Sequence, residues 1–284
     1  MSPRLHVDTE ELHRPAGHHR PVAAEASTVP ARFPEAVDPQ SLSARSRLIG
    51  RSTARSAPGH QAWRGPDGLR LSPRASAAVE AFSALTAAGE PTLTAAVREV
   101  ARAGSAELTG LAHRLKDGES IRRKLATQQA NTGRALPALL HRTEDAVRYT
   151  MVLADESYAA GVARVTALFE QRGYHRLSLN DTWRSQRYRG INTTWADPAT
   201  GIAFEVQFHT PATWRVTRDT HPLYEEFRRI GTPAQRRAEL SRRIGAAYRA
   251  VPMPAGVDPV GVDSVETAPV PGDGRAAGRH SRLA

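Results

Sequence analysis

Residues 202–209, Ile-Ala-Phe-Glu-Val-Gln-Phe-His, alternate between apolar and polar side chains from Phe204 onward, and this alternation decides the fold class. Successive side chains of an extended chain point to opposite faces, so the pattern predicts a β-strand with two unlike faces. The apolar face carries Phe204, Val206 and Phe208. The polar face carries Glu205, Gln207 and His209. We expect the apolar face to pack against helices and the polar face to line a cleft, although an ordinary antiparallel strand with one wetted face would alternate in the same way.

The segments around this strand change from a helical period to a strand period at about residue 145. Before it, helices are predicted at 75–88 and 92–103, with a break at Gly89-Glu90-Pro91, then through Leu108, Leu111 and Leu115, and at 119–131. After it come a strand at 146–153, a helix at 158–172, strands at 174–183 and 188–195, and helices at 211–229 and 233–249. The chain is therefore expected to be α+β: a helical N-terminal lead-in, then a mixed five-stranded sheet flanked by helices.

The two ends of the chain differ in composition from its middle. Residues 1–73 are rich in Pro, Arg, Ser and His and have few clustered large apolar side chains. They bury too little surface to offset about 1–2 kcal/mol per residue of backbone ordering. We expect 1–73 to be a disordered basic arm and 253–284 a disordered tail. The folded unit is then 74–252, which is long enough for one sizeable core.

The 284-residue chain has a formal net charge of +10 and no cysteine. The charge favours anionic partners such as nucleotides, nucleic acid or anionic lipid. The lack of cysteine excludes disulfides and thiolate catalysis. No signal-peptide core and no apolar run long enough for a bilayer is visible, so no membrane is predicted and we expect synthesis in the cytoplasm. The opening residues 5–12 leave export open.

Two carboxylates and a basic helix supply the groups that phosphoryl chemistry needs. Asp145 stands at the start of one predicted strand and Glu205 lies in another. Carboxylates can hold Mg²⁺, and cations near a helix N-terminus can hold a triphosphate. The candidate phosphate-binding residues are Arg114, Lys116, Ser120, Arg123 and Lys124. Taken singly, each feature also fits a structural role, since Asp145 could cap a turn and the helix could be a solvated basic surface.

Tyr188 lies between two arginines, Arg187 and Arg189, and is followed by Gly190. An aromatic ring flanked by guanidinium groups can stack on a purine and meet its phosphates. Glycine permits close approach of another group to the backbone. The ring could equally be a strand residue that packs on a neighbour.

Taken together, these segments resemble the synthetase domain of the RelA/SpoT family, the alarmone synthetases, over about residues 114–228. Arg114-x-Lys116 with Ser120-Ile121-x-Arg123-Lys124 resembles the ATP-binding run of the family. Asp145-Ala146-Val147-Arg148 resembles the segment whose Asp holds Mg²⁺. Arg187-Tyr188-Arg189-Gly190-Ile191-Asn192 resembles the loop whose ring stacks on the acceptor base. Glu205-Val206-Gln207-Phe208-His209-Thr210 resembles the strand with the catalytic Glu.

The resemblance implies a nucleotidyltransferase-like fold and an ATP:nucleotide 3′-pyrophosphokinase activity. Pyrophosphate would pass from ATP to the ribose 3′-hydroxyl of a purine nucleotide, giving AMP and products of the (p)ppApp or (p)ppGpp type. It implies Mg²⁺ as cofactor, with Asp145 and Glu205 as ligands and Glu205 as base. The implied ATP-binding residues are Arg114, Lys116, Ser120, Arg123, Lys124 and Arg148. The implied acceptor-binding residues are Tyr188, Arg187, Arg189, Asn192, Gln207 and His209.

Three positions depart from the family pattern: Asn180, Asn192 and His209. All three lie on the acceptor side, so they leave open whether the acceptor is an adenosine or a guanosine nucleotide. The Tyr loop and residues 220–227 are similar to a secreted or toxin-type subgroup, which implies a neutralising immunity protein as a further partner. Two alternatives stay open: a toxin that pyrophosphorylates the 3′ end of tRNA, and a non-catalytic module that binds nucleotides or nucleic acid.

Overall fold

The computed structural model describes residues 39–54, 61–65, 68–185, 188–229 and 231–257. In chain order its elements are α1 (Pro39–Ala54), β1 (Trp63–Arg64), β2 (Arg70–Leu71), α2 (Pro73–Ala103), β3 (Glu107–Thr109), η1 (Leu111–His113), α3 (Gly118–Thr132), α4 (Leu136–His141), β4 (Val147–Val152), η2 (Asp155–Ser157), α5 (Tyr158–Gln171), β5 (His175–Asp181), β6 (Ile191–Ala196), β7 (Ala203–His209), α6 (Pro211–Arg228) and α7 (Ala234–Arg249). None of the helices described is both long and apolar enough to cross a bilayer.

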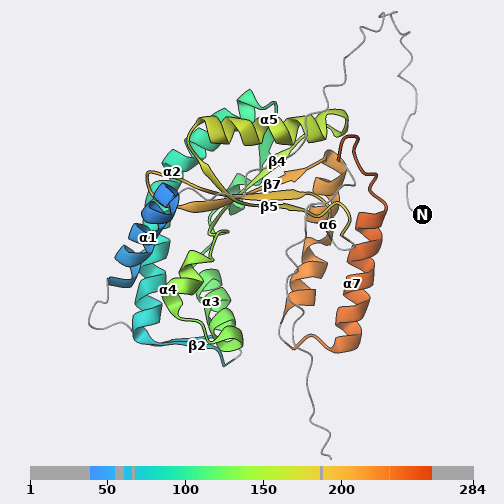
Figure 1. Cartoon of the computed structure of the whole chain (residues 1–284). Helices are drawn as coiled ribbons and strands as arrows, with labels where there is room; N and C mark the ends of the chain where they lie inside the picture. The colour runs from blue at the N-terminus through green and yellow to red at the C-terminus, as the bar shows by residue number, and fades with distance from the viewer. Residues whose placement is uncertain (1–38, 55–60, 66–67, 186–187, 230, 258–284) are drawn as a thin grey trace, which may run out of the picture. The chain divides into compact units, whose positions relative to one another are not determined.

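The centre of the fold is a five-stranded sheet with the strand order β3-β4-β7-β6-β5. Strands β4 and β7 are parallel neighbours, whereas the other three pairs are antiparallel. Helices flank the sheet, as Figure 1 shows. The predicted fold class, α+β with a mixed sheet flanked by helices, is therefore confirmed.

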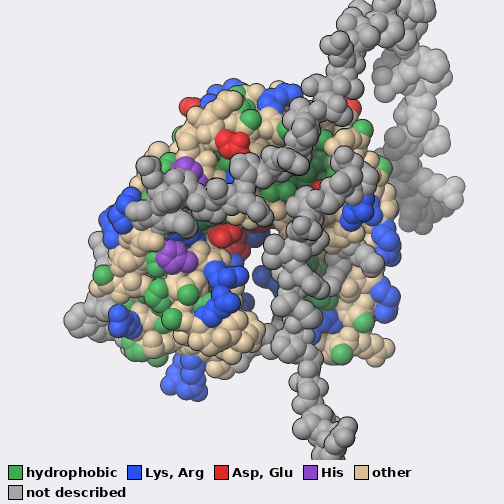
Figure 2. All heavy atoms as spheres, viewed as in Figure 1, with side chains coloured by type: hydrophobic (Ala, Val, Ile, Leu, Met, Phe, Trp, Pro, Cys, Tyr) green, Lys and Arg blue, Asp and Glu red, His purple; other side chains and the backbone are tan. Residues whose placement is uncertain are grey.

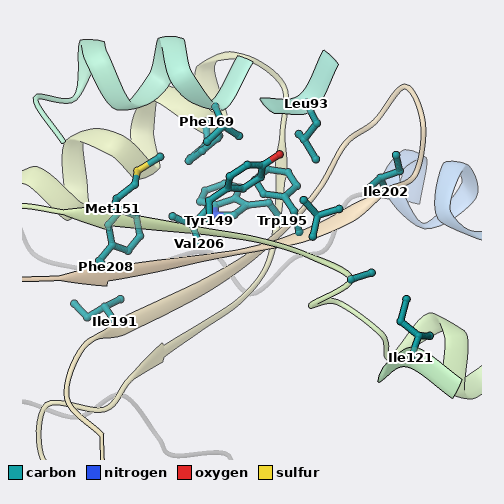
Figure 3. Packing of buried hydrophobic residues seen from close by; sticks show 14 of the residues in the cluster. Leu93, Ile121, Tyr149, Met151, Phe169, Ile191, Trp195, Ile202, Val206 and Phe208 are labelled. Carbon is teal, nitrogen blue, oxygen red and sulfur yellow. The ribbon is translucent and has the colours of Figure 1, made fainter. Parts of the chain in front are cut away.

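The apolar face of the sheet forms the core, as the alternation in residues 202–209 predicts. Phe204, Val206 and Phe208 of β7 are each fully buried. The ring of Phe169 on α5 lies 5.7 Å from that of Phe204 and 5.0 Å from that of Trp195 on β6. Figure 3 shows Phe169, Trp195 and Val206 gathered between the sheet and the helices on that side. The opposite face of the sheet carries the polar side chains of β7, such as Glu205 and Gln207.

Helix α2 runs through Gly89-Glu90-Pro91, where the sequence predicts a break. A proline inside a helix removes one backbone hydrogen bond and strains the preceding turn. Tertiary packing offsets this cost, because the absence of a side chain at Gly89 makes room for Ile202, whose Cδ1 would lie 2.4 Å from a Cβ there. The two predicted helices are one helix of 31 residues.

Residues 107–109 also differ from the prediction, which places them in a helix. They form β3, an edge strand whose Leu108 pairs with Met151 of β4. A strand of three residues is too short to show a period of two, so only the pairing with β4 distinguishes it from the start of a helix.

The expected disordered arm, residues 1–73, contains ordered elements in its second half. Helix α1 and the β1–β2 hairpin lie within it, and α1 packs on α2 and α4. Ala44, Leu48 and Ile49 of α1 are buried. Small numbers of apolar residues suffice here because α1 adds to a core that the rest of the chain already forms. Residues 1–38 and 258–284 lie outside the described residues, and the domain boundaries at 73/74 and 252/253 stay predictions.

Candidate functional site

The polar face of the sheet brings together residues from four strands. The register pairs Glu205 of β7 with Arg148 of β4 on one side and with Thr194 of β6 on the other. Gln207 pairs with Asn192 in the same way, and Asn192 with Asn180 of β5. Because side chains of directly paired residues lie on the same face, these polar groups form one continuous surface.

Both predicted catalytic carboxylates contact one guanidinium group on this surface. The Nε of Arg148 donates to Oε2 of Glu205 at 2.6 Å, and its Nη2 lies 3.5 Å from Oδ2 of Asp145. Asp145 precedes β4 and Glu205 lies in the parallel neighbour β7, so the pairing of these two strands brings them together. Residues 60 positions apart thus share one cation.

Two lysines complete a charged cluster, which we define as Lys116, Lys124, Asp145, Arg148 and Glu205. The Nζ of Lys116 lies 2.5 Å from Oδ2 of Asp145, and the Nζ of Lys124 lies 2.5 Å from Oδ1. Lys124 comes from α3, whereas Lys116 lies in the loop before it, and the backbone N–H of Lys116 donates to the carbonyl of Ala146. Each Asp145 oxygen therefore has its own ammonium partner.

The charged cluster changes the acidity of its members. Burial alone would raise the pKa of Asp145, but the charges of Lys124 and Lys116 hold it well below its usual range. Burial lowers the pKa of Lys116 below its usual value, and the contact with Asp145 raises it only in part; the neighbouring cations Lys124 and Arg148 lower it slightly further. Asp145 is thus ionised at neutral pH, while Lys116 gives up its proton more easily than an exposed lysine.

The two other residues predicted to bind ATP on α3 lie outside this cluster. Ser120 donates its backbone N–H and its hydroxyl to Asp117, the N-cap of α3, each at 2.8 Å. Arg123 is exposed. A carboxylate cap and free N–H groups at a helix start are a common arrangement, so Ser120 also has a purely structural role here.

Arg114 is held by a buried carboxylate that the sequence did not single out. Its Nε and Nη2 contact the two oxygens of Glu90 on α2 at 2.5 and 3.0 Å, and its Nη1 donates to the carbonyl of Leu111 at 2.8 Å. Glu90 is 3 % exposed and also accepts from Thr94, whose hydroxyl contacts that of Tyr149. The only sequence signal for Glu90 is an acidic residue in an otherwise apolar helical stretch.

The predicted acceptor residues form a second group, the tyrosine network, which we define as Tyr188, Asn192, His209 and Thr213. The Tyr188 hydroxyl donates to Oδ1 of Asn192 at 2.9 Å and lies 3.1 Å from Nε2 of His209. The Nδ1 of His209 lies 3.1 Å from the Thr213 hydroxyl on α6. These contacts are mutually consistent when Nε2 of His209 carries the proton and Nδ1 accepts from Thr213.

His209 differs from the role expected of it, direct binding of the acceptor. Its side chain is fully buried, so it contacts Tyr188 and Thr213 and offers no surface to a nucleotide. Burial lowers its pKa to about 4, and the ring is therefore neutral at pH 7. Burial also raises the pKa of Tyr188 well above its usual range. The tyrosine network is thus uncharged.

The three remaining predicted acceptor residues are Gln207, Arg189 and Arg187, and the two that the structure describes have different partners. Gln207 lies beside Glu205 and donates to its Oε1 at 3.3 Å. The Nη1 of Arg189 donates to the carbonyl of Val251 at 2.7 Å, which ties the Tyr188 loop to the segment after α7. Arg187 lies outside the described residues.

Several solved structures are similar to this chain. Small alarmone synthetase 1 from Bacillus subtilis is 17 % identical, with a TM-score of 0.44 over 60 % of this chain and 90 % of that one. The same synthetase bound to its product pppGpp is 18 % identical, with a TM-score of 0.35 over 50 % and 71 %. A GTP pyrophosphokinase family protein from Streptococcus pneumoniae is 18 % identical, with a TM-score of 0.45 over 60 % and 85 %.

No family model matches this sequence, and no curated protein matches it. The solved structures that are similar to this chain thus include a small alarmone synthetase and a GTP pyrophosphokinase family protein.

Proposed function

We propose that this protein transfers the β,γ-pyrophosphoryl group of ATP to the ribose 3′-hydroxyl of a purine nucleotide and releases AMP. One observation carries the proposal: a single guanidinium, Arg148, joins Asp145 and Glu205, while two lysines contact the same Asp145. Paired carboxylates for a metal beside cations for phosphates are the groups that such a transfer needs.

The donor set fits Mg²⁺. Across the residues that the structure describes, no three or more His, Cys, Asp or Glu side chains are arranged so that they could hold a metal ion, so the protein would offer two carboxylates. Mg²⁺ is typically bound through one or two carboxylates, with phosphate oxygens and water as its other ligands. The contact of the Arg148 guanidinium with both acids supports the proposal that they would share a cation. When bound, Mg²⁺ would neutralise charge on the triphosphate.

The lysines of the charged cluster would bind the donor. Lys116 and Lys124 are 24 % and 29 % exposed, so phosphate oxygens can reach them. A triphosphate that draws the two ammonium groups away from Asp145 would free both oxygens of this carboxylate for the metal. Exposed Arg123 would add attraction from the rim, and Arg114, oriented by Glu90, would lie against the adenine.

Glu205 is the candidate base for the acceptor hydroxyl. Asp145 is a poor base because its pKa lies well below the usual range. In the transfer, the 3′-oxygen forms a bond to the β-phosphorus, and the bond from that phosphorus to the α,β-bridging oxygen breaks. The bridging oxygen leaves with AMP, and the hydroxyl proton passes to Glu205. Arg148, which contacts Glu205, would stabilise the negative charge around the reacting phosphate.

The tyrosine network would orient the acceptor. Tyr188 would stack on the purine, with its hydroxyl held by Asn192 and His209. Because Oδ1 of Asn192 accepts from Tyr188, the amide NH₂ of Asn192 is the part left for the base or ribose. Stacking does not distinguish adenine from guanine, so both acceptors remain within the proposal.

Product analysis tests the proposed function. The full chain is mixed with ATP, Mg²⁺ and, in separate reactions, AMP, ADP, GMP, GDP, GTP and tRNA, and the products are separated by ion-exchange chromatography with mass detection. We expect AMP together with an acceptor that has gained a pyrophosphate. Glu205→Gln is the matched inactive control, with Glu99→Gln, an exposed glutamate on α2, as the neutral control.

The products also separate the alternatives. Pyrophosphate on tRNA alone would identify the tRNA-modifying toxin. Binding of nucleotides with no AMP above the Glu205→Gln background would identify a non-catalytic module and contradict the proposal. Release of ADP or free phosphate in place of AMP would also contradict it, because those products require attack at the γ-phosphorus.

A further inference from the structure

Arg45 is a charged side chain in the interior of the protein. It lies on α1 and is 2 % exposed. Burial lowers its pKa to about 10, and the charge of Glu144 opposes this effect, so the guanidinium is still protonated at neutral pH. A buried cation without hydrogen-bond acceptors would be strongly destabilising. Its partners therefore indicate why it is tolerated.

The guanidinium of Arg45 donates to backbone carbonyls from two separate parts of the chain. At the end of α4, its Nη2 lies 2.8 Å from the carbonyl of His141 and 2.8 Å from that of Thr143. In the turn between β6 and β7, its Nη1 lies 3.4 Å from the carbonyl of Gly201. The last carbonyls of a helix have no intrahelical partner, so Arg45 satisfies acceptors that would otherwise be unpaired.

The two anchored segments lead directly to the two acids of the charged cluster. Thr143 lies two residues before Asp145, and Gly201 lies four residues before Glu205. The strands that follow, β4 and β7, are parallel neighbours, so both begin at the same end of the sheet. One side chain on α1 therefore contacts the backbone that leads into both strands.

Gly201 allows α1 to lie against this turn. A Cβ at Gly201 would be 2.4 Å from the carbonyl oxygen of Ala44, the residue before Arg45. Gly201 also has a φ of +74°, a region that L residues rarely adopt. The turn and the helix are thus matched to each other by two independent features, the close backbone approach and the hydrogen bond from Arg45.

From this geometry we infer that Arg45 is a positioning residue for the proposed reaction: by bonding to the carbonyls of Thr143 and Gly201, it sets the separation of Asp145 and Glu205. The inference rests on the proposed function for its catalytic consequence. Misplacement of reacting groups by about 1 Å can lower turnover about 10²-fold. An N-terminal helix far from the charged cluster in sequence would then control how well the two acids act together.

The test compares three variants of the full chain. Arg45→Met keeps an unbranched side chain and removes all hydrogen-bond donors, and Arg45→Lys keeps the charge but loses the ability to reach several carbonyls. Arg51→Met, an exposed arginine on the same helix, is the control. For each we measure melting temperature, kcat, KM for ATP, and the Mg²⁺ concentration that gives half-maximal activity.

We expect Arg45→Met to lower kcat about 10- to 100-fold and to raise the Mg²⁺ requirement, with KM for ATP nearly unchanged. Arg45→Lys should lie between this variant and the wild type, and Arg51→Met should match the wild type. A purely structural role would reduce the amount of folded enzyme without changing its Mg²⁺ requirement. A folded Arg45→Met with unchanged kcat and Mg²⁺ requirement overturns the inference. If Arg45→Met does not fold, an unchanged Mg²⁺ requirement in Arg45→Lys overturns it.

Binding of Mn²⁺ separates this inference from the proposed function. If the wild type forms no AMP, the proposed function fails, but the two acids can still be tested as a metal site. We then measure Mn²⁺ binding to the full chain by electron paramagnetic resonance. Weaker binding in Arg45→Met than in both the wild type and Arg51→Met supports the positioning role, and equal binding in all three overturns it.

Discussion

The charged cluster and the tyrosine network lie on one face of the same sheet but are held together by different interactions. The charged cluster consists of ionised groups, 13–42 % exposed at the side chain, with each acid in contact with at least one cation. The tyrosine network is neutral and is linked by directional hydrogen bonds, with its central member His209 fully buried. In the proposed function, the charged cluster would exchange its partners for phosphate and metal. The tyrosine network cannot exchange partners without leaving a buried polar group unpaired.

This difference assigns different tasks to the two groups. A charged, solvent-accessible cluster on a chain of net charge +10 suits the capture of a polyphosphate, and its strength depends on salt. On the face in Figure 2, Lys and Arg side chains outnumber acidic ones. A neutral network with a buried histidine suits a fixed direction for one aromatic ring, that of Tyr188. Substitutions in the charged cluster should therefore change turnover and the Mg²⁺ requirement. Substitutions in the tyrosine network should change the affinity for the acceptor and the stability of the protein in acid.

The largest effect is expected from Glu205→Gln. The amide cannot accept the proton of the 3′-hydroxyl, and general-base catalysis contributes about 10²–10⁴-fold. We expect turnover to fall by this factor, while the affinity for ATP, measured by isothermal titration calorimetry, changes little because the lysines remain. A Glu205→Gln enzyme with near-normal activity would remove Glu205 from the chemistry.

Asp145→Asn should have the next largest effect, and it should change two quantities in opposite directions: turnover should fall, and ATP affinity without Mg²⁺ should rise. Turnover should fall about 10²-fold or more because a metal ligand is lost. Without Mg²⁺, however, ATP should bind more tightly than to the wild type, because Lys116 and Lys124 no longer have Asp145 as their counter-ion. Titration calorimetry with and without Mg²⁺ measures both. Weaker metal-free ATP binding would contradict the view that the lysines exchange Asp145 for phosphate.

Acid should destabilise the tyrosine network through His209. Its folded pKa of about 4 lies below the usual 6.5. Above pH 6.5 the ring is neutral whether the chain is folded or unfolded. As the pH falls from 6.5 to 4, only the unfolded chain takes up the proton, so the free energy of unfolding decreases, by about 3 kcal/mol in total. Below pH 4 this loss is complete.

Urea titrations at pH 7, 6 and 5 measure this loss, with His209→Phe as the variant that cannot titrate. Its stability should change less with pH than that of the wild type, whatever its stability at pH 7. Burial and Arg45 also lower the pKa of His141, so this residue should contribute to the same loss of stability in acid. A His141→Phe variant measures the contribution of His141 to the pH dependence of the free energy of unfolding. An equal pH dependence in His209→Phe and the wild type would show that the buried ring is not the origin.

Tyr188→Ala should weaken the acceptor alone. Stacking of a base on an aromatic ring contributes about 1–3 kcal/mol, so the acceptor KM should rise about 10- to 100-fold with KM for ATP unchanged. Tyr188→Phe keeps the ring and removes the hydroxyl that contacts Asn192 and His209. A much smaller rise for Phe than for Ala would assign the effect to stacking. Unchanged acceptor kinetics in Tyr188→Ala would exclude the ring from the acceptor site.

The sequence predicted the parts of this fold that local pattern determines. The period of two in residues 202–209 placed Glu205 and Gln207 on one face and Phe204 on the other, as the structure has them. The long helices α5, α6 and α7 were predicted to within a residue or two of their ends. In these segments, local preference and tertiary packing agree.

The parts that the sequence did not predict depend on partners far away in the chain. Arg45 interrupts the apolar pattern of α1 and is buried only because carbonyls about 95 residues later accept its hydrogen bonds. Glu90 resembles a surface residue until Arg114 is placed beside it. His209 belongs by alternation to the polar face, and the packing of Tyr188 and α6 buries it. No local pattern contains this information.

The smallest effect is expected from Arg123→Ala, an exposed arginine next to Lys124 in the sequence of α3. An exposed charge is screened by water and salt, and such pairs contribute about 0–1 kcal/mol. We therefore expect KM for ATP to rise only about two- to fivefold at low salt, with kcat unchanged, and the difference from the wild type to vanish as salt is added. Arg164→Ala, an exposed arginine on α5 across the sheet, is the matched control. A large loss of kcat in Arg123→Ala would instead mean that this side chain moves into the charged cluster when ATP binds, which would extend the exchangeable part of the site along α3.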